Sequence, residues 1–273
     1  MRSLPLKQIT ITGVLLMVFT LVTLTFLPPG ILASHSWGGY HWARTSNPFN
    51  LTLADNLSSS WDPYLATAST DWSVSSVLNT QIVAGFQNPR RCRPTSGRVE
   101  VCNYRYGSNG WLGIAQIWAS GSHITQGTAK VNDTYFSSVT YNTPQWKRLV
   151  MCQEVAHTFG LDHQDENFDN PNLGSCMDYT SDPDGPPSNE HPNQHDYDEL
   201  SLIYAHLDSF TSLAGSSQKL PLGSIISEAA KNQDFENQSE WGRSIRDNGN
   251  VALFERDLGL GNKLFTFVIW AQQ

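Results

Sequence analysis

The amino-acid sequence predicts an α+β fold with a large N-terminal domain and a small β-rich C-terminal region. Runs of β-branched and aromatic residues recur between residues 40 and 136, two helix signals follow between residues 143 and 207, and strand-like runs return after residue 224. With 273 residues, of which 39% are hydrophobic and 15% charged, the chain is long and apolar enough to bury a sizeable core.

The first 33 residues are expected to be a targeting segment. Two basic residues precede an uncharged apolar run at residues 9–27, and a Pro-Pro-Gly sequence ends that run. Cleavage after Ala33 would make the segment a secretory signal peptide, retention would make it a membrane anchor, and a buried core helix is the third alternative. In the first two cases residues 34–273 lie outside the cytoplasm, as a secreted protein or as a membrane-anchored extracytoplasmic domain.

The large domain is expected to span residues 34–210. Its strands are expected at residues 40–44, 49–57, 80–86 and 98–107, with two or three more between residues 110 and 136. A first helix is expected within residues 61–76. Residues 211–223 read as a linker, and residues 224–273 as the small β appendage, with two strands around a Gly-rich turn.

Two further helices follow the strands. Thr143 is a good N-cap, Pro144 suits the first helical position, and Gly160 supplies a C-terminal stop. A long loop rich in Asp, Asn, Pro and Gly then leads to an amphipathic helix at residues 195–207.

The end of the first of these helices carries a pattern typical of a metal-dependent hydrolase. Glu154 is followed by His157, Gly160 and His163. Such an enzyme needs three fixed ligands, an open position for water, and a base beside that water. Ligands at i and i+4 of a helix point the same way, and a glycine three residues later lets the chain turn so that a further histidine reaches back.

Residues 153–163 resemble the H-E-x-x-H-x-x-G-x-x-H signature of the metzincin metallopeptidases, with Gln153 in place of the first histidine. Downstream, the sequence SCMDYT resembles the Met-turn of that family. The resemblance covers roughly residues 35–210 and implies a matrixin-like catalytic domain. Such a domain has a twisted mixed β-sheet, a metal-site helix, a Met-turn and a C-terminal helix.

The resemblance also implies the roles of individual residues. His157, His163 and Gln153 would bind Zn²⁺, and Glu154 would be the general base for a metal-bound water. Met177 would lie beneath the metal, and Tyr179 would reach the metal or steady the transition state.

Three interpretations of Gln153 remain open. It ligates the metal weakly through its amide oxygen, a harder donor than imidazole; or the two motif histidines bind metal with a histidine from elsewhere; or metal binding is lost. The histidines available for the second interpretation are His123, His191 and His195.

The four cysteines fit an oxidising compartment and allow three pairings. Cys92 and Cys102 bracket a turn-rich hairpin and are expected to pair. A Cys152–Cys176 bridge would then tie the metal-site helix to the loop of the Met-turn.

Charge and composition limit the partners. The net charge is −8 and no block of Lys and Arg is present, so nucleic acid is not an expected partner. Residues 164–172 are rich in carboxylates and amides, so a calcium ion there is an alternative to a solvated loop.

The prediction is therefore an exported, monomeric zinc endopeptidase acting on proteins or peptides. The alternatives are an inactive metzincin fold that binds proteins or cell-surface polymers and a membrane-anchored structural ectodomain.

Overall fold

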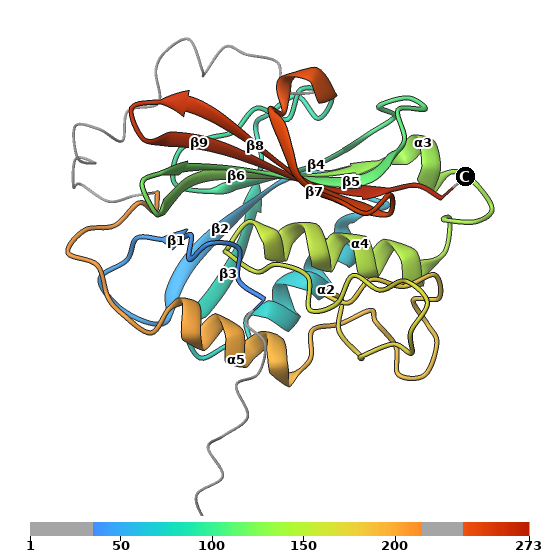
Figure 1. Ribbon diagram of the computed structural model, residues 1–273, viewed down its shortest axis with the longest axis horizontal. Coiled ribbons are helices and arrows are strands. Elements are labelled where there is room, and N and C mark those ends of the chain that lie inside the picture. Colours follow the sequence, from blue (N-terminus) through green and yellow to red (C-terminus); the bar gives the residue numbers. More distant parts are fainter. Residues whose placement is uncertain (1–34, 215–236, 273) are drawn as a thin grey trace, which may run out of the picture. The chain divides into compact units, whose positions relative to one another are not determined.

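The computed structural model describes residues 35–214 and 237–272 (Figure 1). The targeting segment predicted at residues 1–33 and most of the predicted linker lie outside the described residues. The described helices are α2 (Asp62–Trp72), α3 (Asp133–Phe136), α4 (Pro144–His157), α5 (Gln194–Ile203) and the short 3-10 helix η2 (Gln238–Glu240). No helix in this part of the chain is long and apolar enough to cross a membrane.

The strands form one nine-stranded sheet. They are β1 (His41–Trp42), β2 (Phe49–Asn56), β3 (Leu78–Ala84), β4 (Val99–Tyr104), β5 (Trp111–Ser120), β6 (His123–Asn132), β7 (Arg243–Asp247), β8 (Val251–Gly259) and β9 (Asn262–Trp270). The order is β3-β2-β4-β6-β5-β9-β8-β7, and β1 pairs with β6. Pairs among β1, β2, β3, β4 and β6 are parallel, whereas β5, β9, β8 and β7 are joined by antiparallel pairs. The predicted mixture of helices and strands is confirmed.

The C-terminal strands continue the main sheet and do not form the separate appendage expected from the sequence. β9 pairs with β5 from Trp111↔Trp270 to Ser120↔Asn262. Most of β9 is buried, and Phe265, Phe267 and Ile269 belong to the same apolar core as the residues of α4. The physical reason is the apolar run LFTFVIW. A strand that is buried on both faces needs other elements packed on both faces, and the large sheet and its core supply them where a small appendage would not.

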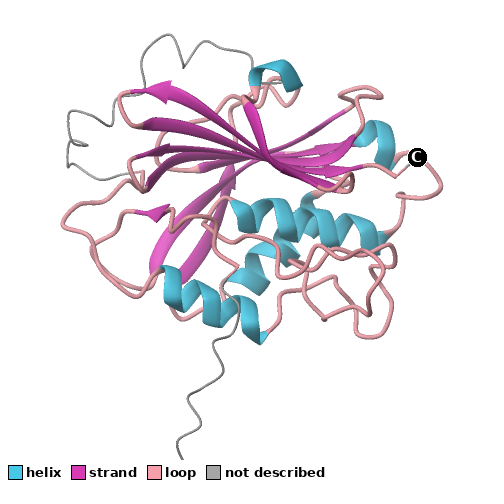
Figure 2. Cartoon of the chain, in the orientation of Figure 1, coloured by secondary structure: helices cyan, strands magenta, loops and turns pink. Residues whose placement is uncertain are grey.

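Helices α2, α4 and α5 lie on one face of the sheet, as Figure 2 shows. Helix α4 begins as predicted: the Thr143 side chain accepts a hydrogen bond from the Trp146 backbone N–H, and Pro144 is the first helical residue. The helix ends at His157, and the chain turns away at Gly160, whose φ is +107°. A Cβ at Gly160 would lie 2.5 Å from the Tyr40 carbonyl oxygen, so glycine is required at this turn.

Candidate metal centre

The last turn of α4 presents three polar side chains to the interior. Gln153, Glu154 and His157 are all fully buried; Glu154 lies against Gly113 of β5, and His157 lies against Phe267 of β9. Gly113 of β5 allows this close packing, because a Cβ there would lie 2.5 Å from the Glu154 Oε1 atom. The helical spacing therefore places an amide, a carboxyl group and an imidazole together in the core.

The turn at Gly160 brings His163 back to His157. Their ring centroids lie 4.7 Å apart, and the two rings are nearly perpendicular at 88°. The Nδ1 of His157 lies 2.8 Å from the Leu161 carbonyl oxygen, and the Nδ1 of His163 lies 3.0 Å from Glu166 Oε1. Because both partners accept hydrogen bonds, each Nδ1 donates, and a neutral ring in this position keeps its lone pair on Nε2.

Six polar atoms at this site are buried and have no hydrogen-bond partner among the described residues. They are Gln153 Oε1 and Nε2, Glu154 Oε1 and Oε2, His157 Nε2 and His163 Nε2. Buried polar groups are almost always paired, and an unpaired one costs about 1–3 kcal/mol. A cation held by the two Nε2 atoms and the Gln153 oxygen would satisfy three of these atoms, and solvent in the same space would pair with Glu154 and with the Gln153 amide nitrogen, so the residues fit a bound metal.

Burial also sets the protonation of the site. Desolvation raises the pKa of Glu154 well above its ordinary value. Desolvation, together with the charge of His163, lowers the pKa of His157 well below its ordinary value. His157 is therefore a neutral imidazole, the form that binds metals.

The predicted Met-turn lies next to this site. Met177 is fully buried, its backbone N–H donates to Ser175 Oγ at 2.9 Å, and its carbonyl accepts from the Gln164 N–H at 2.6 Å. Tyr179 has its ring centroid 6.5 Å from that of His163. Its hydroxyl donates to the Asn250 carbonyl at 2.8 Å, so Tyr179 is held by the turn before β8.

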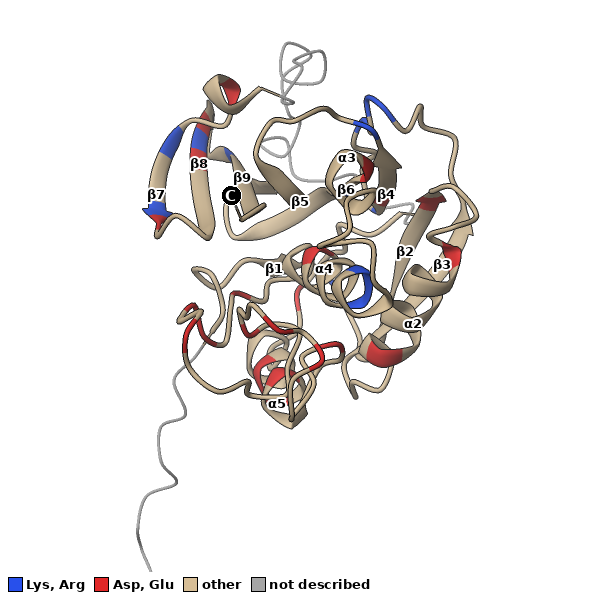
Figure 3. Cartoon of the chain, turned by 90° about the vertical axis from the view of Figure 1, so that its right-hand side faces the viewer, with Lys and Arg blue, Asp and Glu red and all other residues tan. Residues whose placement is uncertain are grey.

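The C-terminal strands cover the site, which sequence reasoning missed. The ring of Phe267, on β9, stacks on His157 with centroids 4.1 Å apart and planes 13° apart. Arg246, on β7, donates to both carboxylate oxygens of Asp162 and lies 2.8 Å from Glu166 Oε1. Figure 3 shows basic positions on β7 and β8 and acidic positions in the loops around α5. The strongly apolar sequence of β9 was the available signal.

Both predicted disulfides are confirmed. Cys92 pairs with Cys102, and Cys152 pairs with Cys176. The second bridge joins the middle of α4 to the residue before Met177, so it connects the two segments that form the candidate site.

The other histidines considered as ligands take part in different contacts. His191 lies 2.7 Å from Asp71 Oδ2, the ring of His195 stacks on His35 with centroids 4.9 Å apart, and His123 lies 3.1 Å from Asp208 Oδ1. These contacts leave Gln153 as the third candidate ligand beside His157 and His163.

The loop considered for calcium, residues 164–172, contributes one residue to a potential metal-binding group. Its Glu166 and the two residues that precede the loop, Asp162 and His163, place one ligand atom each within 4.8 Å of one another. The Arg246 guanidinium contacts both carboxylates of this group, which supplies a positive charge there.

Comparisons with known proteins give no relative. No protein-family model matches this chain. No curated protein matches it either.

Proposed function

We propose that this chain is an exported, zinc-dependent endopeptidase with a metzincin-like fold. The observation that carries the proposal is the group of six buried, unpaired polar atoms on Gln153, Glu154, His157 and His163. Their residue types and spacing are those of the signature in the sequence, apart from Gln153. The two disulfides are consistent with export to an oxidising compartment.

Four features of the fold support the metzincin-like part of the proposal. The structure has a mixed sheet, a helix that ends in the candidate ligands, a buried turn at Met177, and the helix α5 after the long loop. These features are the ones that the sequence resemblance implies. The substrate would be a protein or peptide, bound by a monomer.

Each residue of the site has a role that its environment fits. When bound by Gln153, His157 and His163, a zinc ion would polarise the scissile carbonyl and acidify a water molecule. Glu154 accepts a proton from the attacking water as the new C–O bond forms, and it gives that proton to the leaving nitrogen as the C–N bond breaks. Burial raises the pKa of Glu154, which makes its ionised carboxylate a stronger base for this step.

The carbonyl of Leu161 and the carboxylate of Glu166 act through the histidines. Each accepts the Nδ1 hydrogen of one ring and so directs its Nε2 toward the site. The disulfide between Cys152 and Cys176 holds α4 against the turn that contains Met177.

The burial of the site favours a second candidate function. Gln153, Glu154 and His157 have no exposed surface, and Phe267 lies against His157. A substrate therefore reaches Glu154 only if part of this cover moves. A domain that holds a metal but only binds other proteins or surface polymers needs no such movement.

Hydrolysis of an unfolded, fluorophore-labelled protein by the full exported chain would separate these functions. Wild type is compared with Glu154→Ala, with and without a zinc chelator. Asp198→Ala is the matched control, because Asp198 is an exposed carboxylate on α5. We expect hydrolysis by wild type and by the control, and none by Glu154→Ala or in the presence of the chelator. Equal hydrolysis by all three proteins would contradict the proposal, and a zinc-loaded protein without hydrolysis would favour the binding function.

A further inference from the structure

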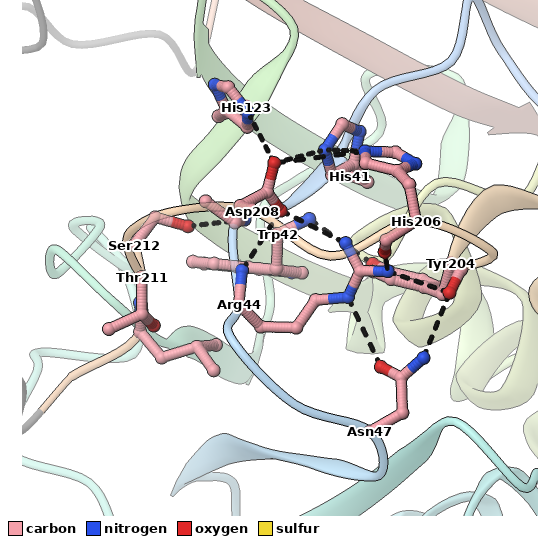
Figure 4. Close-up of polar contacts among 12 residues, drawn as sticks. His41, Trp42, Arg44, Asn47, His123, Tyr204, His206, Asp208, Thr211 and Ser212 are labelled. Atoms are coloured by element: carbon pink, nitrogen blue, oxygen red, sulfur yellow. Dashed lines mark hydrogen bonds and ion pairs between the residues drawn. The ribbon is translucent and has the colours of Figure 1, made fainter.

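A cluster of three histidines and one aspartate lies apart from the candidate site. His41 is in β1, His123 begins β6, and His206 and Asp208 follow α5. Figure 4 shows the three imidazole rings directed toward the Asp208 carboxylate. The parallel pairing of β1 with β6 makes His41 the partner of His123, so the sheet itself places two of the rings side by side.

His41, His123 and Asp208 of this histidine cluster place one ligand atom each within 4.8 Å of one another, and His206 lies beside them. Asp208 Oδ1 lies 3.5 Å from His41 Nε2, 3.1 Å from His123 Nε2 and 3.8 Å from His206 Nε2. The Nε2 atoms of His41 and His206 lie 3.1 Å apart. One carboxylate oxygen therefore faces three imidazole nitrogens, and two of those nitrogens face each other.

The tautomer of His41 leaves a lone pair at the centre of the cluster. Its Nδ1 lies 2.9 Å from the Gly39 carbonyl oxygen, which only accepts hydrogen bonds. Nδ1 therefore carries the hydrogen, and in the neutral ring Nε2 presents a lone pair to the Asp208 carboxylate. Two lone pairs that face each other repel, so a proton or a metal ion must lie between them.

The second oxygen of Asp208 is held by a separate set of contacts. Oδ2 accepts from the Arg44 backbone N–H at 3.1 Å and from Arg44 Nη1 at 3.0 Å. The Arg44 guanidinium is fixed in turn by the Tyr204 carbonyl at 2.7 Å and by the His206 carbonyl. This arrangement keeps Asp208 Oδ1 directed at the histidines, as outer-shell hydrogen bonds do for metal-binding carboxylates.

We propose that His41, His123, His206 and Asp208 form a structural site for a divalent transition-metal ion, with zinc as the first choice. Imidazole suits zinc, and four protein ligands without an open position are typical of a structural zinc site. Zinc–ligand bonds of about 2.0–2.2 Å in a tetrahedron place neighbouring ligand atoms roughly 3.3–3.6 Å apart. Four of the six distances between ligand atoms, from 3.1 to 3.8 Å, lie around that value. His41, His123 and Asp208 form the compact part of the site, and His206 would close on the metal as the fourth ligand.

The metal would join three segments that are far apart in the sequence. It would fix the two-residue strand β1 to β6 and both of them to the chain that follows α5. The two-residue β1 has few sheet hydrogen bonds of its own, so a metal there would contribute directly to the stability of the fold. This inference uses none of the residues of the proposed catalytic site.

Metal analysis of the untagged, full exported chain tests the inference, with His206→Ala as the main variant. The His206 side chain is 56% exposed, so its removal leaves the core intact. His191→Ala is the matched control, because that side chain is 51% exposed and belongs to a different contact. After equilibration with zinc and gel filtration, we expect His206→Ala to retain one metal ion fewer per chain than wild type and than the control. Its affinity at this site should fall by more than about 100-fold, since it loses a direct ligand.

Two further measurements keep the result independent of the proposed catalysis. His163→Ala should still bind the ion held by the histidine cluster, and His206→Ala should still bind an ion at the candidate catalytic site. When Co²⁺ replaces zinc in His163→Ala, the protein should show the visible absorption of a tetrahedral ion. Adding His123→Ala to this variant should remove that absorption. Equal metal content and equal chelator sensitivity of wild type and His206→Ala would overturn the inference and would mean that protons alone satisfy the cluster.

Discussion

Replacing Arg246 by alanine tests whether the C-terminal strands are fastened to the loop that carries His163. Arg246 donates to both oxygens of Asp162 and contacts Glu166, and its side chain is 33% exposed. A hydrogen bond to a charged group contributes about 1.5–3 kcal/mol, and solvent exposure reduces that value. We therefore expect the substitution to destabilise the protein by about 2 kcal/mol.

Thermal unfolding measures this effect directly. For a domain of this size, 1 kcal/mol corresponds to a shift in Tm of about 2–4 °C, so Arg246→Ala should lower Tm by about 4–8 °C. Arg243→Ala is the matched control on the same strand, because its side chain is 75% exposed and pairs with Glu255 at 3.2 Å. Such exposed pairs contribute at most about 1 kcal/mol. Equal Tm shifts for the two variants would refute the assignment of Arg246 as a clamp.

The same variant tests how substrate would reach Glu154. If β7 must separate from the His163 loop before substrate binds, a loss of 2 kcal/mol in the closed form raises the open population about 30-fold, since 1.36 kcal/mol corresponds to a factor of ten. Hydrolysis that depends on Glu154 should rise accordingly in Arg246→Ala. A lower Tm with an unchanged rate would show that substrate does not enter by that movement.

Three other substitutions test the site and its support. Gln153→His should strengthen zinc binding at the candidate site at least about 10-fold, measured by competition with a chelator of known affinity, because imidazole is the better zinc donor; an unchanged affinity would mean that Gln153 is not a ligand. Phe267→Ala should lower the free energy of unfolding in urea by about 3–5 kcal/mol, because a buried ring is lost from the shared core; a change below about 1 kcal/mol would contradict the central position of β9. Replacing Cys152 and Cys176 together by serine removes the bridge that closes a loop with a sequence separation of 24, and it should lower the free energy of unfolding by about 3–4 kcal/mol in the same assay. Reduced wild type is the control, and it should be no more stable than the variant. No difference between the variant and oxidised wild type would refute this value.

Local sequence patterns predicted several local features of the domain: the ends of α4, one disulfide loop and the candidate ligands. Thr143, Pro144 and Gly160 fixed the ends of α4, because caps and turns depend on residues close together in the chain. The same holds for the short loop closed by Cys92 and Cys102, although β4 pairs in parallel with β2 and β6 and these described residues do not form the expected hairpin. The spacing from Gln153 to His163 identified the candidate ligands, since helix geometry places Gln153 and His157 together and the turn at Gly160 returns His163.

Long-range pairing could not be deduced in this way. The pattern of β9 shows that the strand is buried, but it does not show that the partner is β5 or that Phe267 lies on His157. The histidine cluster was missed for the same reason: His41 and Asp208 are distant in the sequence, and neither belongs to a spaced motif.

The sequence by itself thus determined the helix that carries the candidate ligands and the turn that returns His163, and it favoured one of three possible disulfide pairings, which the structure has. Only the tertiary structure decided that the ligands are covered and that a second group of ligand atoms exists. The physical reason is that side-chain direction within a helix or turn follows from local backbone geometry. Contacts between β5 and β9, or between β1 and the chain after α5, depend instead on how the whole core packs.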